Sequence, residues 1–270
     1  MIEALAKLRH AAPLPRSLAA RAALLLLVGL APMQVAPASA AEFSSAQKTE
    51  LGGIIKDYLI KNPEVLREAL TELDRRQKAE EVAARQKVVS DQAGKLFSSN
   101  YQVVVGNPKG NVTLVEFFDY NCGYCKKALD DLSKLMKADP NLRVVLKDFP
   151  VLGPGSVEAA QVAGALRAQF KGDKFFEFHQ KLLQARGQVG KAQAMAVAKE
   201  LGADMDKLAK DMDSADVRTG IEEVMQVADQ LNLTGTPSFV IGQDVVVGAV
   251  GYDEMKSKVD MVRKCGKVVC

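Results

Sequence analysis

Two cysteines three residues apart follow a strongly apolar stretch near the middle of the chain, and this feature constrains the fold most. Residues 111–118 are β-branched and aromatic and apolar on both faces, which is typical of a central parallel strand. After a short loop come Cys122 and Cys125, and then apolar residues at helical spacing as far as Met136. The sequence therefore predicts a strand, a loop and a helix, with Cys122 at the helix N-terminus and Cys125 one turn inside.

This placement of the cysteines indicates redox chemistry. Unpaired N–H groups and the helix dipole favour an anion at a helix N-terminus. We therefore expect Cys122 to form a thiolate readily and to be the exposed nucleophile. Cys125, more deeply buried, would then attack a mixed disulfide at Cys122 and resolve it. The alternative is half of a zinc site, which needs two further soft ligands nearby.

Residues 1–40 predict an export signal. A basic region precedes an apolar stretch, residues 22–31, that is too short to span a bilayer comfortably. A small-residue cleavage site ends at Ala40, so cleavage is expected before Ala41. The alternative is an uncleaved anchor. Export implies an oxidising compartment, in which disulfides form and persist.

The charge balance of the rest of the chain argues against nucleic-acid binding. Four of the 36 basic residues and one of the 33 acidic residues lie in residues 1–40, so the remainder carries 32 of each. His10 also lies in that segment, which leaves His179 alone. A single histidine argues against a His-rich metal site and against a Cys–His or Ser–His catalytic pair. We interpret His179, in an aromatic helical stretch, as structural.

Residues 41–100 predict an N-terminal helical stalk. A first helix over 42–60 precedes a longer one that begins near Pro63 and continues to Phe97. The middle of the longer helix, 74–81, is nearly all charged or polar, so it cannot bury much surface alone. Its first part has an apolar seam of Leu66, Leu70 and Leu73. The segment is either an oligomerisation stalk whose seam pairs with other protomers, or a helical arm folded onto its own domain or loosely attached.

The remainder, residues 101–270, predicts one α/β domain with an all-helical insertion at about 153–232. The order is strand, redox helix, strand, helical insertion, two strands and a helix, and the insertion can serve as a crossover between parallel strands. Outside the insertion and the central strand, the expected elements are a strand and turn at 103–110, strands at 142–149, 238–241 and 245–247, and a last helix at 253–264.

A proline begins the strand that follows the insertion. Thr236-Pro237 stands directly before the apolar stretch 238–241, where a missing ladder N–H is tolerated. An X–Pro bond can be cis at modest cost. A cis bond beside the cysteines would present the Thr236 backbone to an incoming chain and leave room for a substrate sulfur. The alternative is an ordinary trans-proline strand start.

Together these motifs resemble the DsbA-like thioredoxin-fold thiol:disulfide oxidoreductases of the bacterial periplasm. The resemblance covers roughly residues 101–264 and rests on EFFDYNCGYC, the helical insertion and GTPSFVI. It implies a thioredoxin fold, a periplasmic location and a reaction that needs no cofactor or metal. Carried over by position, Cys122 is the nucleophile, Cys125 the resolving thiol and Pro237 the cis-proline, with Thr236 before it.

Glu116 matches the acidic residue that this family places under the active site. A carboxyl in an otherwise apolar strand is desolvated, which raises its pKa. It could then accept or return the proton of Cys125. The alternative is that Glu116 lies at an exposed strand end.

Two features depart from the simplest DsbA enzymes. The residues between the cysteines are Gly123 and Tyr124, like those of the disulfide isomerase DsbC and unlike the Pro-His of the strong oxidase. We therefore expect a weaker oxidant. The N-terminal helical segment resembles the stalk of ScsC-type proteins, which trimerise and isomerise disulfides.

A second cysteine pair, Cys265 and Cys270, closes the chain. Gly266 can end the last helix and let the tail fold back. Three outcomes are open: a local structural disulfide, a second redox relay, or a metal-binding tail.

The resulting hypothesis is an exported thiol:disulfide interchange protein that leans towards isomerase or reductase. Its expected partners are unfolded or misfolded secreted proteins, a membrane partner that recycles the site, and further copies of the chain through residues 42–97. The alternatives are a DsbA-like oxidase and a copper-binding thiol protein, since soft thiolates suit Cu(I). A third alternative is a chaperone-like holdase, a protein that binds unfolded chains, built on the stalk.

Overall fold

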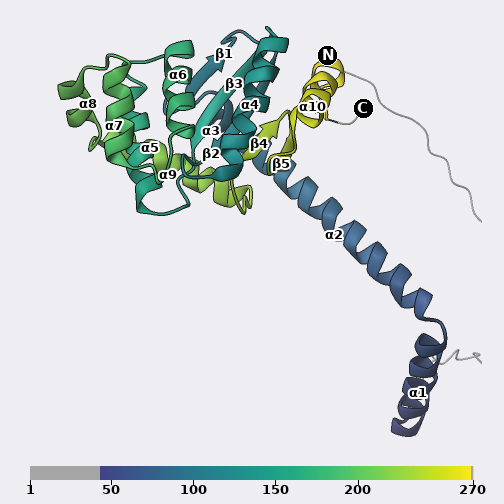
Figure 1. The fold of residues 1–270 in the computed structure, drawn as a ribbon. Coiled ribbons are helices and arrows are strands. Elements are labelled where there is room, and N and C mark those ends of the chain that lie inside the picture. The colour runs from purple at the N-terminus through teal and green to yellow at the C-terminus, as the bar shows by residue number, and fades with distance from the viewer. Residues whose placement is uncertain (1–42, 269) are drawn as a thin grey trace, which may run out of the picture. The chain divides into compact units, whose positions relative to one another are not determined.

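A computed structural model describes residues 43–268 and 270. The predicted signal, residues 1–40, lies outside the described residues. The elements in chain order are α1 (Ser45–Lys61), α2 (Pro63–Asp91), α3 (Ala93–Phe97), β1 (Val103–Gly106), β2 (Val112–Phe118), α4 (Gly123–Ala138), β3 (Leu142–Asp148), α5 (Pro154–Leu166), α6 (Gly172–Leu183), α7 (Lys191–Glu200), α8 (Met205–Asp211), α9 (Ala215–Gln230), β4 (Ser238–Ile241), β5 (Asp244–Val247) and α10 (Tyr252–Cys265). Figure 1 shows them.

The strands form one mixed sheet in the order β1-β3-β2-β4-β5. The strand before the cysteines, β2, is central as predicted. It pairs in parallel with β3 and antiparallel with β4, so it is parallel on one side only. The outer strands β1 and β5 are both antiparallel to their neighbours. A central position buries both faces of β2, which explains its nearly continuous apolar sequence.

Two hydrophobic cores cover the two faces of the sheet. Leu114 and Phe118 of β2 belong to the core that includes α4, α6 and α10. Val115 and Phe117, which alternate with them, belong to the core that includes α3 and α9. This alternation follows from the period of two in a strand. The amphipathic helix α4 buries Leu129 and Leu132 among others, and so holds the cysteines against the first face.

The expected all-helical insertion forms α5 to α9 between β3 and β4. Side-chain caps begin two of these helices. The Asp204 carboxylate accepts from the backbone N–H of Lys207 in α8, and Ser214 Oγ accepts from that of Val217 in α9. Such caps satisfy donors that a helix N-terminus leaves unpaired. The insertion connects β3 and β4, which flank β2 and run in opposite directions, so it is not the crossover between parallel strands that the sequence suggested.

The long predicted helix is interrupted near its end. The sequence predicted one helix to Phe97, whereas α2 ends at Asp91 and a short helix α3 follows after Gln92. The turn lets Leu96 pack fully buried in the second core beside Val89. Burial of this apolar side chain outweighs continuation of a regular helix. The last turns of α2 are further attached by Arg85, whose Nε donates to the carbonyl of Leu231.

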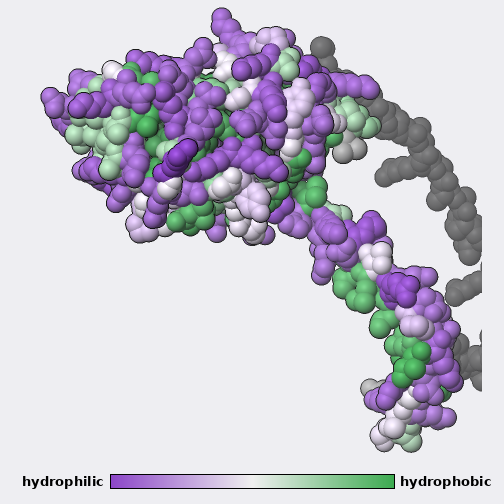
Figure 2. All heavy atoms as spheres, in the orientation of Figure 1, coloured by the Kyte–Doolittle hydropathy of each residue, from purple (hydrophilic) through white to green (hydrophobic). Residues whose placement is uncertain are grey.

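The first part of α2 is exposed and carries the apolar seam. Leu66, Leu70 and Leu73 are each half exposed or more. Figure 2 shows hydrophobic side chains on the surface of this part of the helix. The charged middle is stabilised within the helix itself, since Glu72 pairs with Arg75 and Arg76. Such i, i+3 and i, i+4 pairs contribute a few tenths of a kcal/mol each.

Helix α1 forms a separate unit that ends at Lys61. It buries none of its residues. Its exposed apolar side chains include Leu51, Ile54 and Ile55. Within the described part of the chain, no helix has the length and apolar character needed to cross a membrane.

Candidate active site

The two cysteines lie where the sequence placed them. Cys122 is the N-cap of α4, and its Sγ accepts from the backbone N–H of Cys125 at 3.4 Å. Both are free thiols. Cys125 is fully buried in the first turn of α4. Burial raises the pKa of the Cys125 thiol, and the Glu116 carboxylate raises it further. Cys125 is therefore a protonated thiol at rest and needs a base before it can attack.

The expected exposure of Cys122 is wrong. Only 6% of this residue is exposed. The cause is the loop before β4, since the Cys122 thiol donates to the carbonyl oxygen of Thr236 at 3.1 Å. A segment 114 residues away in sequence therefore covers the sulfur.

The loop before β4 contains the expected cis-proline, because the Thr236–Pro237 peptide bond is cis. Ser238, the first residue of β4, fixes the turn by donating from Oγ to the carbonyl of Gly235 at 2.7 Å. The Pro237 carbonyl accepts from the N–H of Gly248 at 2.8 Å. These bonds hold the Thr236 backbone beside the Cys122 sulfur.

Glu116 lies inside the domain and not at an exposed strand end. It is 1% exposed, and neither carboxylate oxygen has a hydrogen-bond partner among the described residues. Burial raises the pKa of Glu116 to about 8. It lies on the same face of β2 as Phe118, towards α4, and its charge raises the pKa of Cys125. Glu116 is thus a buried carboxyl group whose charge acts on the Cys125 thiol.

The loop that carries Cys122 is fixed by a polar network that the sequence analysis missed. The buried Asp119 carboxylate accepts from the backbone N–H groups of Val151 and Leu152 and from Ser156 Oγ. Asn121 donates to the Val189 carbonyl at 2.9 Å and accepts from its N–H at 2.7 Å. The signal was the Asp-Tyr-Asn sequence between strand and cysteines, because Asp and Asn commonly bind nearby backbone in turns.

Apolar side chains are exposed close to this network. Tyr124, between the cysteines, is 69% exposed. Val151 and Leu152, whose backbone is held by Asp119, are 41% and 49% exposed. Exposed apolar groups of this kind are typical of surfaces that contact another molecule.

His179 is a core residue, in agreement with the structural interpretation. Its ring lies 4.5 Å from that of Phe118 and 5.7 Å from that of Tyr120, centroid to centroid. Neither ring nitrogen has a hydrogen-bond partner among the described residues, and burial lowers the pKa of His179 to about 3. The imidazole is therefore neutral and supplies no positive charge to a thiolate.

The C-terminal cysteines form a disulfide, one of the three outcomes left open by the sequence. Helix α10 ends at Cys265, and Gly266 follows in the left-handed conformation with φ 75°. Glycine adopts this conformation without a steric penalty. The bridge closes a short loop at the far end of α10.

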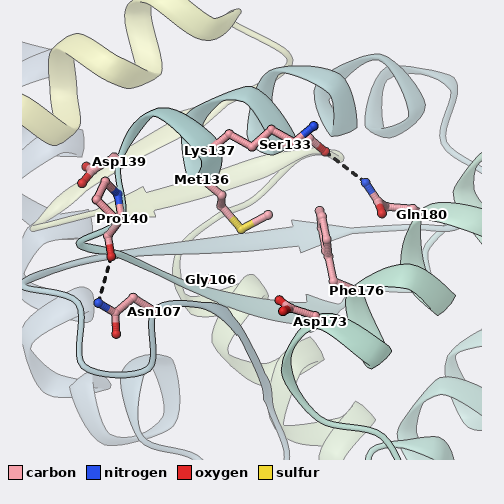
Figure 3. A pocket seen from close by; sticks show the side chains of 10 residues that line it. All are labelled: Gly106, Asn107, Ser133, Met136, Lys137, Asp139, Pro140, Asp173, Phe176 and Gln180. Carbon is pink, nitrogen blue, oxygen red and sulfur yellow. Dashed lines mark hydrogen bonds between the residues drawn. The ribbon is translucent and has the colours of Figure 1, made fainter.

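A separate cavity of about 540 Å³ lies between α4, α6 and the end of β1. Figure 3 shows Met136 and Phe176 pointing into it. None of its lining residues belongs to the cysteine site.

Known proteins resemble the chain over most of its length. A family model described as Thioredoxin matches residues 98–261, and one described as Copper resistance protein ScsC N-terminal domain matches residues 47–80. A thioredoxin-like oxidoreductase from Silicibacter pomeroyi, a solved structure, is 40% identical with a TM-score of 0.60 and covers 64% of this chain and 98% of its own. A linker-deletion mutant of Proteus mirabilis ScsC is 26% identical with a TM-score of 0.62 and covers 84% of this chain and 99% of its own.

Some curated relatives are much longer than the segment that they share with this chain. The Na(+)/H(+) antiporter NhaA 1 of Salinispora arenicola is 31% identical over 140 residues, which are 51% of this chain and 21% of the antiporter. The chain thus spans about a fifth of the length of that relative. Disulfide bond formation protein D of Bacillus subtilis is 25% identical over 172 residues, covering 59% of this chain and 76% of its own. The chain belongs to the thioredoxin family, as a DsbA-like thioredoxin-fold protein with an N-terminal segment of ScsC type.

Proposed function

We propose that the protein is a thiol:disulfide interchange enzyme acting on exported proteins, with isomerase or reductase activity. The observation that carries the proposal is the free thiol of Cys122 at the start of α4, 3.1 Å from the carbonyl that precedes cis-Pro237. This arrangement joins a nucleophile to a stretch of backbone that can hold a substrate chain. Cys122, Cys125, Thr236, Pro237 and Glu116 are the proposed site residues.

The reaction proceeds in two exchanges. The Cys122 thiolate attacks one sulfur of a substrate disulfide, forming a mixed disulfide and releasing the other substrate sulfur as a thiolate. Cys125 then loses its proton to Glu116, and its thiolate attacks Cys122 Sγ. The Cys122–Cys125 disulfide forms and the second substrate thiolate leaves, taking a proton from solvent. The substrate is reduced by two electrons and the enzyme oxidised by two.

An isomerase uses the same mixed disulfide differently. A free thiol of the substrate attacks it, which returns Cys122 as a thiolate and leaves a new pairing in the substrate. Because an isomerase must start reduced, it needs a membrane partner that supplies electrons. Gly123 and Tyr124 between the cysteines, and the ScsC-type segment at residues 47–80, favour this reading. Unfolded or misfolded exported chains would contact Thr236 and the apolar groups Tyr124, Val151 and Leu152.

One pair of assays separates isomerase from oxidase. A chain of residues 41–270 is added to a scrambled multi-disulfide protein in a glutathione buffer, and separately to a reduced peptide. Rapid recovery of the scrambled protein is the expected result. No recovery together with fast oxidation of the peptide would overturn the isomerase proposal in favour of a DsbA-like oxidase.

The copper-binding alternative has its own test. Two thiolates at the start of α4 could hold Cu(I). Metal content is measured after purification under reducing conditions, with and without the Cys122→Ser change. Stoichiometric copper that depends on Cys122, without disulfide exchange, would replace the enzyme proposal with a metal carrier.

The exposed seam of α2 predicts self-association of the chain. Burying two leucines against another copy contributes roughly 3 kcal/mol, or about a hundredfold in a dissociation constant. Leu66→Lys together with Leu70→Lys should therefore convert an oligomer into a monomer. Light scattering measures this. Glu68→Lys, a matched exposed change on the same helix, should leave the mass unchanged.

Loss of the oligomer should affect the two activities differently. Oxidation or reduction of a small peptide should stay within about twofold of wild type, because the site lies in the thioredoxin domain. Isomerisation of a large scrambled protein should fall. A wild-type chain that is monomeric at all concentrations would refute the oligomerisation proposal. The N-terminal segment would then be the helical arm described as the alternative.

A further inference from the structure

The last turns of α2 contact the segment that leads into the cis-proline loop. Arg85 of α2 donates from Nε to the carbonyl of Leu231 at 3.2 Å, and from Nη2 to the carbonyl of Asn232 at 3.3 Å. These two residues follow α9 directly, and Thr236 stands four residues after Asn232. A side chain from the long N-terminal helix therefore binds the chain just before the backbone that faces Cys122.

The way in which α9 ends explains why these carbonyls need a donor. Asn232 takes the left-handed conformation with φ 51°, which asparagine tolerates better than most residues. The chain then turns, and the N–H of Leu233 donates to the carbonyl of Ala228 at 2.9 Å. A helix end leaves its last carbonyls without an intrahelical donor. The Arg85 guanidinium supplies two N–H groups in a fixed fork, and a positive charge that suits the negative end of the helix dipole.

Apolar packing joins α2 to the same segment. Val89 of α2, one turn after Arg85, is buried in the second core together with Leu231. Leu233 packs against this core as well. The side chain of Arg85 is itself only 20% exposed. The contact between α2 and the end of α9 is therefore packed as well as hydrogen-bonded.

Thr236 is held from both directions along the chain. After it, the Ser238 hydroxyl and the strand β4 fix the loop. Before it, Thr234 is exposed, and the anchor is the end of α9 with its bonds to Arg85. The place of the Thr236 carbonyl, 3.1 Å from the Cys122 sulfur, thus depends on an anchor on each side.

We propose that Arg85 is a positioning residue for the cis-proline loop: it ties α2 to the end of α9 and so keeps Thr236 where its backbone can hold a substrate chain. This inference rests on the proposed function. A loop that has the binding arrangement for only part of the time binds in proportion to that fraction. Release of Arg85 should therefore weaken substrate binding and leave the sulfur chemistry of Cys122 unchanged. The helix that carries the exposed leucine seam would then also shape the substrate site.

Steady-state kinetics with a peptide disulfide test the proposal. The peptide carries several residues on each side of its disulfide, so that it reaches the loop, and reduced glutathione supplies the electrons. Arg85→Ala should raise KM about fivefold, a coupling of ordinary size. It should keep kcat within about twofold of wild type, which is the pattern of lost binding that ground state and transition state share.

Amide hydrogen exchange follows the anchor itself. In the Arg85→Ala chain, exchange should speed up in residues 231–233, whose N–H groups close the end of α9. It should stay at the wild-type rate in β2, which exchanges only when the whole domain opens. Faster exchange in β2 as well would assign the change in KM to lost stability and refute the positioning role.

Three further variants separate the carbonyl contacts from other effects. Arg85 also pairs with Glu81 at 2.9 Å, and Glu81→Gln removes this pair while the carbonyl contacts stay. Arg75→Ala removes an arginine from the exposed part of the same helix. Both variants should keep the wild-type KM. Arg85→Lys retains the charge and a donor, and its KM should lie between those of wild type and Arg85→Ala.

The outcomes for function and inference are distinct. If the wild-type protein exchanges no disulfide with the peptide, the proposed function fails. If it does exchange and Arg85→Ala keeps the wild-type KM, the role of Arg85 is refuted while the exchange function stands. If Glu81→Gln raises KM as much as Arg85→Ala does, the ion pair and not the carbonyl contacts holds the loop, which also overturns the inference.

Discussion

The Cys122→Ser chain should lose every disulfide exchange activity, by at least about 1,000-fold. The hydroxyl of serine cannot replace the sulfur atom that forms the mixed disulfide, and Cys125 is fully buried and held as a protonated thiol. Recovery of a scrambled protein and oxidation of a reduced peptide should both fall to the uncatalysed rate. Since serine can still cap α4 with its oxygen, the variant should fold.

The Cys125→Ser chain should behave differently. Cys122 can still attack, but nothing resolves the mixed disulfide within the enzyme. Substrate should therefore remain attached through Cys122, visible on a non-reducing gel and removed by a reductant. Failure to trap any substrate would contradict the assignment of Cys125 as the resolving thiol.

The tail cysteines provide the matched control. Replacing Cys265 and Cys270 together by serine removes cysteines from the end of α10 and leaves Cys122 and Cys125 in place. Exchange activity should stay within about twofold of wild type, and the short loop limits the loss of stability to roughly 2 kcal/mol. The opposite result would place the active site at the C-terminus: full exchange activity in the Cys122→Ser chain, and loss of that activity when Cys265 and Cys270 are replaced.

The sequence predicted those parts of the fold that depend on local pattern. The apolar run of β2, the cysteine spacing and the helical periodicity of α4 lie within some 25 consecutive residues. The break at Gln92 was not predictable, because it serves the burial of Leu96 against a sheet formed later in the chain. The domain boundaries drawn at residues 40 and 100 stay predictions.

The site was predictable to the same extent. Cys122, Cys125 and Pro237 stand out by motif, and the desolvation of Glu116 follows from its apolar strand. The low exposure of Cys122 depends on a contact with Thr236, which no local pattern encodes. Likewise Asp148 ends a strand whose register with β2 places it opposite Phe118, and a single sequence does not give that register.

Glu116→Gln should make the protein more stable in alkali. Burial raises the pKa of Glu116 to about 8 from its ordinary value of 4.5. At a pH between these two pKa values, Glu116 is protonated in the folded chain and ionised in the unfolded chain. The free energy of unfolding therefore falls as the pH rises through this window. Glutamine has a similar shape, stays neutral, and removes this loss.

The expected size follows from the same shift. Between pH 5 and pH 8 wild type should lose roughly 3 kcal/mol more stability than the Glu116→Gln chain, at 1.36 kcal/mol for each pH unit in the window. Below pH 4.5 the two chains should differ little in slope. Asp148 titrates in the same direction in both chains, so the difference between them isolates Glu116.

Urea unfolding at several pH values measures this, with both chains reduced so that the cysteines are in one state. Glu177→Gln, an exposed acid on α6, is the control and should follow wild type at every pH. Equal pH slopes for wild type and Glu116→Gln would show that Glu116 is ionised and solvated in the folded protein. A carboxylate with an ordinary pKa would be a weak base for the buried thiol of Cys125, and the proposed resolving step would need another base.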